Sequence, residues 1–156
     1  NDDDFAFLDA GTTTYLMIDY LEGSKATFVT NGISHGKKLA QVGCKVFIVG
    51  GEVKATTDAI IGLAAAKNLQ KYNFSKAFIG TNGVSEKQGC TTPDTDEAML
   101  KAVAVEKSFV TYVLADGSKF GKVSAVTFAP IDAVCIVCDK CEDEAIKERT
   151  VIKEVV

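Results

Sequence analysis

Short apolar runs alternate with helix-forming segments along the whole chain, and this alternation limits the possible folds more than any other feature of the sequence. The apolar runs have the length of buried strands, and glycine, asparagine or aspartate follows several of them closely. We expect strands at residues 5–8, 26–30, 45–49, 77–79, 109–115, 124–128, 133–137 and 151–156.

The segments between these runs predict helices. Residues 15–21 are nearly all apolar and follow good N-cap residues, so they indicate a buried helix. Asp58 can cap a helix that runs to about Tyr72, and the dipeptide Thr92–Pro93 is typical of a helix start. The other expected elements are short helices at 34–41 and 142–148 and a long polar loop at 80–92.

Strands that alternate with helices predict βαβ units. Such units build a mostly parallel sheet with helices on both faces, because each crossover lays a helix against the sheet. The predicted fold class is therefore α/β and Rossmann-like. A chain of 156 residues fits one domain, and we expect residues 1–156 to form it.

Charge and composition argue against several kinds of partner. Lysine and arginine number 17 against 21 acidic residues, a net charge of −4, and no basic run is present. Phosphate contacts dominate nucleic-acid affinity, so this chain by itself is a poor DNA or RNA binder. No apolar stretch reaches transmembrane length, so no membrane partner is expected. The chain starts with Asn1 rather than Met, and we interpret it as a fragment whose N-terminal part has been removed.

The chain has five cysteines, an odd number, and no secretory signal. This indicates free thiols in a reducing compartment, and we expect a cytoplasmic protein. The C-x2-C-x2-C spacing at 135–141 also admits a metal site, with a fourth ligand from Cys44, Cys90 or His35. In a strand the first two of these thiols would point to opposite faces, so buried thiols are favoured and no metal is expected. The single histidine, His35, is interpreted as structural or as a rim residue.

Polar residues and glycines gather where the predicted strands end. In an open parallel sheet, ligands bind outside the carboxyl ends of the strands, and glycine lets the backbone approach them closely. The sequence therefore predicts a ligand site at this edge of the sheet. The junctions concerned are DAGTTT at 9–14, TNG at 30–32, GGE at 50–52, GTNG at 80–83 and DGSKFG at 116–121.

The first junction has the composition of an anion site. Gly11 allows a turn, and Thr12, Thr13 and Thr14 then enter a helix N-terminus. Unpaired N–H groups, the helix dipole and three hydroxyls could together hold a phosphate dianion. The alternative is ordinary N-capping by threonine after a βα turn. The stretch is neither a Walker A loop nor GxGxxG.

Two further groups of charged residues are candidates for the same site. Lys119 follows a strand and could reach a phosphate or a sugar hydroxyl, or it could be a solvated loop lysine. Asp94, Glu97 and Lys101 share one helical face. That face could present carboxylates to sugar hydroxyls, or it could hold an ordinary salt bridge from Glu97 to Lys101 with the acids placed favourably near the helix N-terminus.

Taken together, DAGTTT, VTNG, VGGEV, GTNGV, GCTTPDTDEA and LADGSKFG resemble, in this order, the C-terminal effector-binding domain of DeoR-family transcriptional repressors. The resemblance covers residues 5–139. It implies a fold related to ribose-5-phosphate isomerase and CoA transferases, and a domain that senses a phosphorylated sugar and forms homo-oligomers. It implies no cofactor. It also implies that operator DNA is a partner only of an N-terminal winged helix-turn-helix domain. The effector-binding residues it implies are Asp9, Gly11, Thr12, Thr13, Thr14, Asn31, Asn82, Asp94, Glu97, Lys101 and Lys119.

The function expected from this resemblance is ligand sensing in a repressor of sugar metabolism, without catalysis. Fructose 1-phosphate is the first candidate effector and tagatose 6-phosphate the second. One alternative is a sugar-phosphate isomerase-like enzyme, which would need a positioned carboxylate base from among Asp9, Asp94 and Glu97. In the loop GTNGVS, Asn82 and Ser85 stand where the isomerase relatives carry acidic residues, which disfavours that alternative. The other alternative is a metal-binding or redox module formed by the cysteines of residues 135–141.

Overall fold

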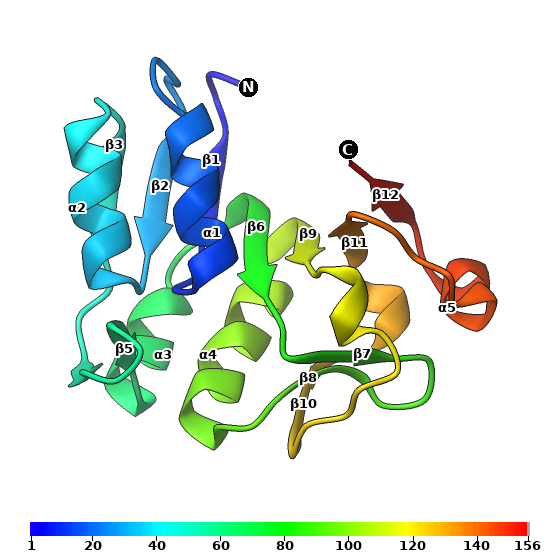
Figure 1. Cartoon of the computed structure of the whole chain (residues 1–156). Helices are drawn as coiled ribbons and strands as arrows, with labels where there is room; N and C mark the ends of the chain where they lie inside the picture. The colour runs from blue at the N-terminus through cyan, green and yellow to red at the C-terminus, as the bar shows by residue number, and fades with distance from the viewer. Residues whose placement is uncertain (156) are drawn as a thin grey trace.

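The computed structural model describes residues 1–155, and its centre is a seven-stranded sheet in which every pair of neighbouring strands is parallel. The strand order is β12-β11-β9-β6-β1-β2-β3 (Figure 1). The expected strand at 151–156 is β12, and Val156 lies outside the described residues. The bounds are β1 (Phe5–Leu8), β2 (Thr27–Thr30), β3 (Lys45–Ile48), β6 (Phe74–Gly80), β9 (Ser108–Leu114), β11 (Cys135–Cys138) and β12 (Ile152–Glu154).

Helices cover both faces of this sheet, and alternate side chains of β1 show why. Leu8 packs in a cluster with Leu39 of α2, whereas Phe7 packs in a second cluster with Leu69 of α3 and Leu100 of α4. Successive side chains of a strand point to opposite faces, so both faces are buried, as in other parallel sheets. This confirms the predicted fold class. The helices are α1 (Thr12–Met17), α2 (Ile33–Gln41), α3 (Leu63–Leu69), α4 (Thr95–Glu106) and α5 (Glu144–Arg149), with 3-10 turns η1 (Ile18–Tyr20), η2 (Gly117–Lys119) and η3 (Ile131–Ala133).

The order of the strands places a switch point between β1 and β6. From β1 the chain moves to β2 and β3 on one side, and from β6 it moves to β9, β11 and β12 on the other (Figure 1). The loops that leave the carboxyl ends of β1 and β6 therefore diverge, which opens a crevice between them.

The polar segment at 80–92 is not the long loop that the sequence predicts. It forms β7 (Gly83–Ser85) and β8 (Gly89–Thr92), which pair with β10 (Val126–Ala129) in a small antiparallel sheet. Gly83 lies against the carbonyl of Lys122 so closely that no side chain fits there. Close backbone contact between distant segments builds this sheet, and local hydrophobic periodicity does not report it.

The helix expected from Asp58 to Tyr72 is also wrong in its first part. Residues 52–61 form a hairpin of β4 (Glu52–Lys54) and β5 (Ala59–Ile61), and α3 begins only at Leu63. Asp58 has a φ of 56°, in the left-handed region, which ends the hairpin turn. Its carboxylate accepts a hydrogen bond from the Ser34 N–H (2.9 Å) and thus fastens the hairpin to α2.

Replacing Asp58 by alanine is expected to lower the free energy of unfolding by about 1–2 kcal/mol, through left-handed strain and the lost bond to Ser34. Asparagine tolerates this conformation and keeps an acceptor, so Asp58→Asn should stay close to the original stability. Urea unfolding of the three chains measures the difference. Equal stability of the alanine and asparagine variants would show that this turn carries no such constraint.

Two helix starts lie elsewhere than expected. The helix expected at 15–21 begins at Thr12 and ends at Met17, where η1 follows, and the segment is not buried throughout, since Leu16 of α1 is 58% exposed and Tyr20 of η1 is 88% exposed. Helix α4 begins at Thr95 and not at Thr92–Pro93, because the Asp94 carboxylate accepts the N–H bonds of Asp96 and Glu97 as its cap. Within residues 1–155, no helix combines the length and the apolar character needed to cross a membrane.

Candidate functional site

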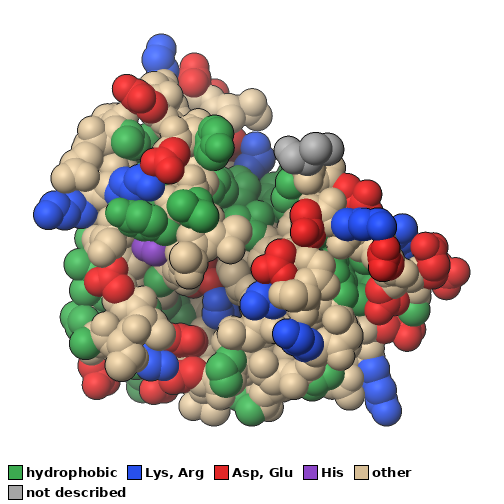
Figure 2. Space-filling view, in the orientation of Figure 1, with side chains coloured by type: hydrophobic (Ala, Val, Ile, Leu, Met, Phe, Trp, Pro, Cys, Tyr) green, Lys and Arg blue, Asp and Glu red, His purple; other side chains and the backbone are tan. Residues whose placement is uncertain are grey.

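A cavity of about 680 Å³ lies at the switch point, outside the carboxyl ends of β1 and β6. Figure 2 shows this face of the molecule hollowed, with lysine and acidic side chains gathered in the hollow. Of the residues that the sequence predicts for the site, Asp94 does not line the cavity, because it caps α4. The predicted residues that do line it are Asp9, Gly11, Thr12, Thr13, Thr14, Asn31, Asn82, Glu97, Lys101 and Lys119.

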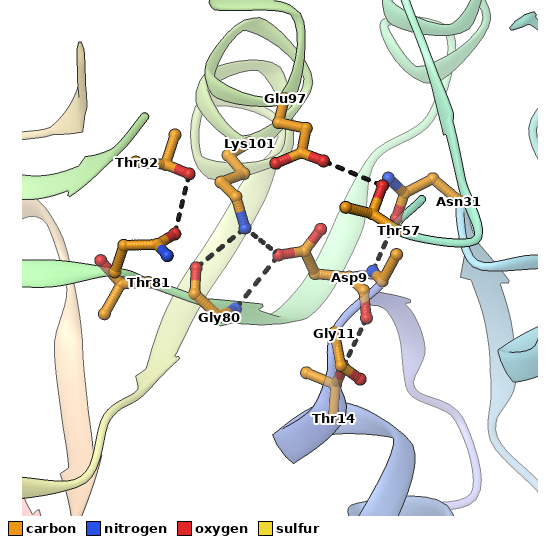
Figure 3. A network of polar contacts seen from close by, with 12 residues as sticks. Asp9, Gly11, Thr14, Asn31, Thr57, Gly80, Thr81, Thr92, Glu97 and Lys101 are labelled. Carbon is orange, nitrogen blue, oxygen red and sulfur yellow. Dashed lines mark hydrogen bonds and ion pairs between the residues drawn. The ribbon is translucent and has the colours of Figure 1, made fainter. Parts of the chain in front are cut away.

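A buried ion pair at the floor of the cavity connects α4 with the carboxyl ends of β1 and β6. Lys101 of α4 donates to the Asp9 carboxylate after β1 and to the Gly80 carbonyl at the end of β6 (2.9 Å; Figure 3). Asp9 also accepts the Gly80 N–H (3.1 Å), and the two charged residues are 3% and 7% exposed. The salt bridge that the sequence suggests between Glu97 and Lys101 is thus replaced by one from Lys101 to Asp9.

Hydrogen bonds to Asn31, just after β2, and to His35 of α2 hold the loop that follows β1. The Ala10 N–H donates to the Asn31 side chain (2.8 Å), whose amide donates in turn to the carbonyl of Ile60 (3.3 Å). The Gly11 N–H points at His35 Nε2 (3.2 Å). Asn31, which the family resemblance places among the effector-binding residues, therefore uses both ends of its amide to shape the loop.

The three threonines of this loop do not play equal parts. Thr14 is buried and its hydroxyl donates to the Asp9 carbonyl (2.6 Å), so it serves the protein itself (Figure 3). Thr12 and Thr13 are exposed on the cavity wall. The N-cap is Gly11, without a side-chain cap, so capping by threonine is not the reason for this run. The first-turn amides of α1 lack intrahelical acceptors, as at every helix start.

The opposite wall is pinned by the β4–β5 hairpin. Lys54 pairs with Asp94 (2.7 Å) and Glu97 (3.4 Å), and Thr57 donates to the same Glu97 oxygen (3.1 Å). The Lys54 ammonium holds the pKa of the Asp94 carboxyl below its usual range, helped by the α4 amides. Glu97 lines the cavity while both of these hairpin residues hold its carboxylate.

The third side of the cavity comes from β6 and the loop after β9. Asn82 is exposed there, and its side-chain oxygen accepts from the Thr92 hydroxyl (3.0 Å). Asp116 caps η2, and its bonds from Ser118 lower the pKa of its carboxyl. Lys119 of the same turn lines the cavity and has no salt-bridge partner within residues 1–155. Among the lysines that line the cavity, it is therefore the one that forms no direct ion pair within residues 1–155.

Sequence reasoning missed some lining residues. Thr81 and Asp116 stand inside junctions that the sequence marks, so the strand-end argument could have included them. The hairpin tip at 56–58 has no such signal, because the pattern there resembles a helix start. His35 is 5% exposed and touches the loop after β1, which makes it structural as expected and also part of the cavity wall.

The cysteine segment lies apart from this cavity. Cys138 and Cys141 are 3% and 1% exposed, which confirms buried thiols at these two positions, whereas Cys135 points to the other face of β11 and is only partly buried. Burial raises the pKa of the Cys138 thiol to about 11. In the described part of the chain, no group of three or more His, Cys, Asp or Glu side chains is placed to hold a metal ion.

A parallel α/β sheet with a polar cavity at its switch point is the usual architecture of domains that bind small molecules. Residues 1–140 match the family model of the DeoR C terminal sensor domain, and the chain belongs to this family. The expectation drawn from the sequence motifs is thereby confirmed.

Curated relatives agree with this assignment. The chain is 44% identical to the uncharacterized HTH-type transcriptional regulator FruR of Bacillus subtilis, over 97% of this chain and 62% of that protein. It is 32% identical to the lactose phosphotransferase system repressor of Staphylococcus aureus, over 92% of this chain and 58% of that protein. The chain thus spans about three-fifths of the length of these relatives.

Solved structures show the same fold in enzymes. The chain is similar to ribose 5-phosphate isomerase A from Neisseria gonorrhoeae, with a TM-score of 0.56 and 16% identity over 81% of this chain and 48% of the isomerase. The isomerase from Methanocaldococcus jannaschii gives a TM-score of 0.54 and 16% identity over 77% and 48%. At this identity the likeness concerns the fold alone, and it confirms the predicted relation to the isomerase fold.

Proposed function

We propose that this chain is the sensor part of a transcriptional repressor of sugar metabolism and binds a phosphorylated sugar in the cavity between β1 and β6. The observation that supports the proposal is a cavity lined on one side by N–H and O–H donors and on another by side-chain acceptors. Thr12 and Thr13 offer N–H and O–H donors, and Lys119 lies on the same cavity without a salt bridge within residues 1–155.

The phosphate would lie over the first turn of α1, because amides, hydroxyls and a lysine ammonium are its usual partners. The sugar would extend toward Glu97 and Asn82, whose oxygens accept hydrogen bonds from hydroxyls. The Asp9 carboxylate on the cavity floor is already neutralised by Lys101, so it does not repel the anion as an unpaired charge would.

The relatives indicate the class of sugar. One of them is named the lactose phosphotransferase system repressor, and this name links that relative to a sugar and to phosphate transfer. We keep fructose 1-phosphate as the first candidate effector and tagatose 6-phosphate as the second. Binding would alter operator affinity through an HTH domain and a homo-oligomeric arrangement, with a coupling free energy of about 1–3 kcal/mol.

Sensing fits this cavity better than isomerisation. An enediol mechanism needs a carboxylate free to take a proton from the substrate. Asp9 is held by Lys101 and Gly80, and Glu97 is held by Lys54 and Thr57. Turnover of ribose 5-phosphate or a fructose phosphate that is lost in Glu97→Gln would reverse this choice.

Thermal unfolding with a panel of sugars tests the proposal. A ligand at a hundredfold excess over its Kd stabilises the chain by about 2.7 kcal/mol. For a domain of this size, that raises Tm by roughly 5–10 °C. We expect fructose 1-phosphate or tagatose 6-phosphate to give such a shift, and free fructose and tagatose to give none.

Thr13→Ala should reduce the shift by about half or more, because it removes an exposed hydroxyl from the cavity wall without touching a protein contact, and tenfold weaker binding leaves only about 1.4 kcal/mol of stabilisation at the same ligand concentration. Thr95→Ala is the matched control, because Thr95 is an exposed threonine in the first turn of α4 that does not line the cavity and makes no side-chain hydrogen bond within residues 1–155. A broad panel of sugar phosphates that leaves Tm unchanged would end the proposal for this chain.

A further inference from the structure

The ring of His35 occupies an unusual position on the wall of this cavity. It lies 5% exposed between α2 and the loop after β1, with its edge against the Tyr15 ring (centroids 5.2 Å apart). Its Nε2 meets three groups of the anion loop: the Gly11 N–H at 3.2 Å, the Gly11 carbonyl at 2.8 Å and the Thr14 hydroxyl at 3.1 Å. Its Nδ1 is buried and has no hydrogen-bond partner among the described residues.

These contacts cannot all be satisfied by one neutral ring. If Nε2 carries the proton, it donates to the Gly11 carbonyl, and the Gly11 N–H is left for another acceptor. If Nε2 carries the lone pair, it accepts from the Gly11 N–H, and that N–H is held by the protein. The tautomer of a histidine is normally set by the partner of its other nitrogen, and here Nδ1 has none.

We propose that His35 is a positioning residue of the anion site, whose tautomer decides whether the Gly11 N–H is held by the protein or offered to the effector's phosphate. The inference rests on the proposed function, since it assigns the phosphate to the loop that His35 contacts. Phosphate binding then favours the tautomer with the proton on Nε2, because this one releases the Gly11 N–H and keeps its carbonyl bonded.

The surroundings keep the ring neutral near pH 7, so that two tautomers are available. Burial lowers the pKa of His35 and outweighs the bond to Gly11. The charged groups that face the ring are Asp9 from β1, Asp58 from the hairpin and Lys38 from its own helix. The two acids raise its pKa and the lysine lowers it.

Gly32 is the reason that the ring fits where it does. A Cβ at this position would collide with His35 Nδ1 and Cγ, although the backbone of Gly32 (φ −96°, ψ 125°) is one that alanine adopts readily. Gly32→Ala therefore displaces the ring while it leaves the imidazole in the chain, and it complements direct substitution of the histidine.

The chain has a single histidine, so its ring nitrogens give one set of signals in long-range ¹H–¹⁵N NMR spectra. We expect the Nε2–H population to rise when the wild-type chain at pH 7 is saturated with fructose 1-phosphate or, in a second titration, with inorganic phosphate. The Gly11 amide signal should move in the same titration. A tautomer that is the same with and without anion overturns the inference.

Affinity provides the second readout, with the same probes. His35→Leu and Gly32→Ala should weaken binding about tenfold, because the ring no longer positions the Gly11 carbonyl; this is the upper range for the loss of a hydrogen bond between neutral groups. His35→Gln retains a donor and an acceptor near Nε2 and should restore binding to within about threefold of the wild type. Lys37→Ala, exposed on the same helix and away from the cavity, is the control.

The two proposals fail in different ways. A wild-type chain that binds no sugar phosphate refutes the proposed function, and this inference falls with it. A wild-type chain that binds, beside His35→Leu and Gly32→Ala variants that bind equally well, refutes the role of His35 and leaves the proposed function intact. The NMR titration needs no variant, so a substitution that fails to fold does not prevent a decision.

Discussion

Replacing Lys101 by methionine should destabilise the protein by about 3–5 kcal/mol, because it leaves the Asp9 carboxylate buried without its counter-charge. Both side chains are more than nine-tenths buried, so water cannot screen the loss. The Gly80 N–H remains as a donor to Asp9, but one amide does not replace an ammonium ion. Urea unfolding monitored by circular dichroism measures the change.

The double variant Asp9→Asn with Lys101→Met separates charge from packing. It removes both charges, and the asparagine oxygen can still accept from Gly80, so we expect it to recover more than half of the lost stability. Lys67→Met, at an exposed position of α3, is the control and should change little. If the single Lys101 variant is as stable as the control, the pair does not hold the floor of the cavity.

Replacing Lys119 by alanine should weaken the binding of a phosphorylated sugar about 10- to 100-fold, the range of a hydrogen bond to a charged group. The fold should be unaffected, because Lys119 is only partly buried and forms no salt bridge within residues 1–155. Isothermal titration with the effector found in the thermal panel measures the affinity.

Lys122→Ala tests whether the effect belongs to the site or to the general charge of this loop. Lys122 is exposed, three residues further on, and does not line the cavity. We expect it to bind like the wild type at physiological salt, where exposed charges are screened within about 8 Å. Equal losses in the two variants would place the phosphate away from Lys119.

Much of the fold and of the site was predictable because the signals are local. The apolar runs at 5–8 and 45–49 have strand length whatever their partners, and residues after β1 and β6 reach one edge because parallel strands end together. This local reasoning marked Gly11 and Lys119, which line one cavity, whereas Lys101 was singled out by its helical face and by the family resemblance.

The errors arise where distant segments meet. The sequence of residues 52–61 resembles a helix start. The segment is a hairpin because Asp58 adopts the left-handed conformation and accepts a hydrogen bond from α2. The small sheet at 83–92 depends on backbone contact with the segment near Lys122, which no local period records. Asp94 has the spacing of a site residue, yet its capping of α4 and its pairing with Lys54 withdraw it from the cavity.

The sequence by itself determined the parallel α/β fold, its family and the edge of the sheet where ligands can bind. Hydrophobic periodicity and glycine-rich strand ends are local signals, because each depends only on residues that are neighbours in the sequence. Only the tertiary structure decided how the polar groups of that edge divide their hydrogen bonds. Asn31 and Thr14 are occupied by the loop itself, whereas Thr12, Thr13 and Lys119 are left on the cavity wall. A hydrogen bond depends on which groups meet in space, and Asp9 and Lys101 meet across 92 positions of sequence.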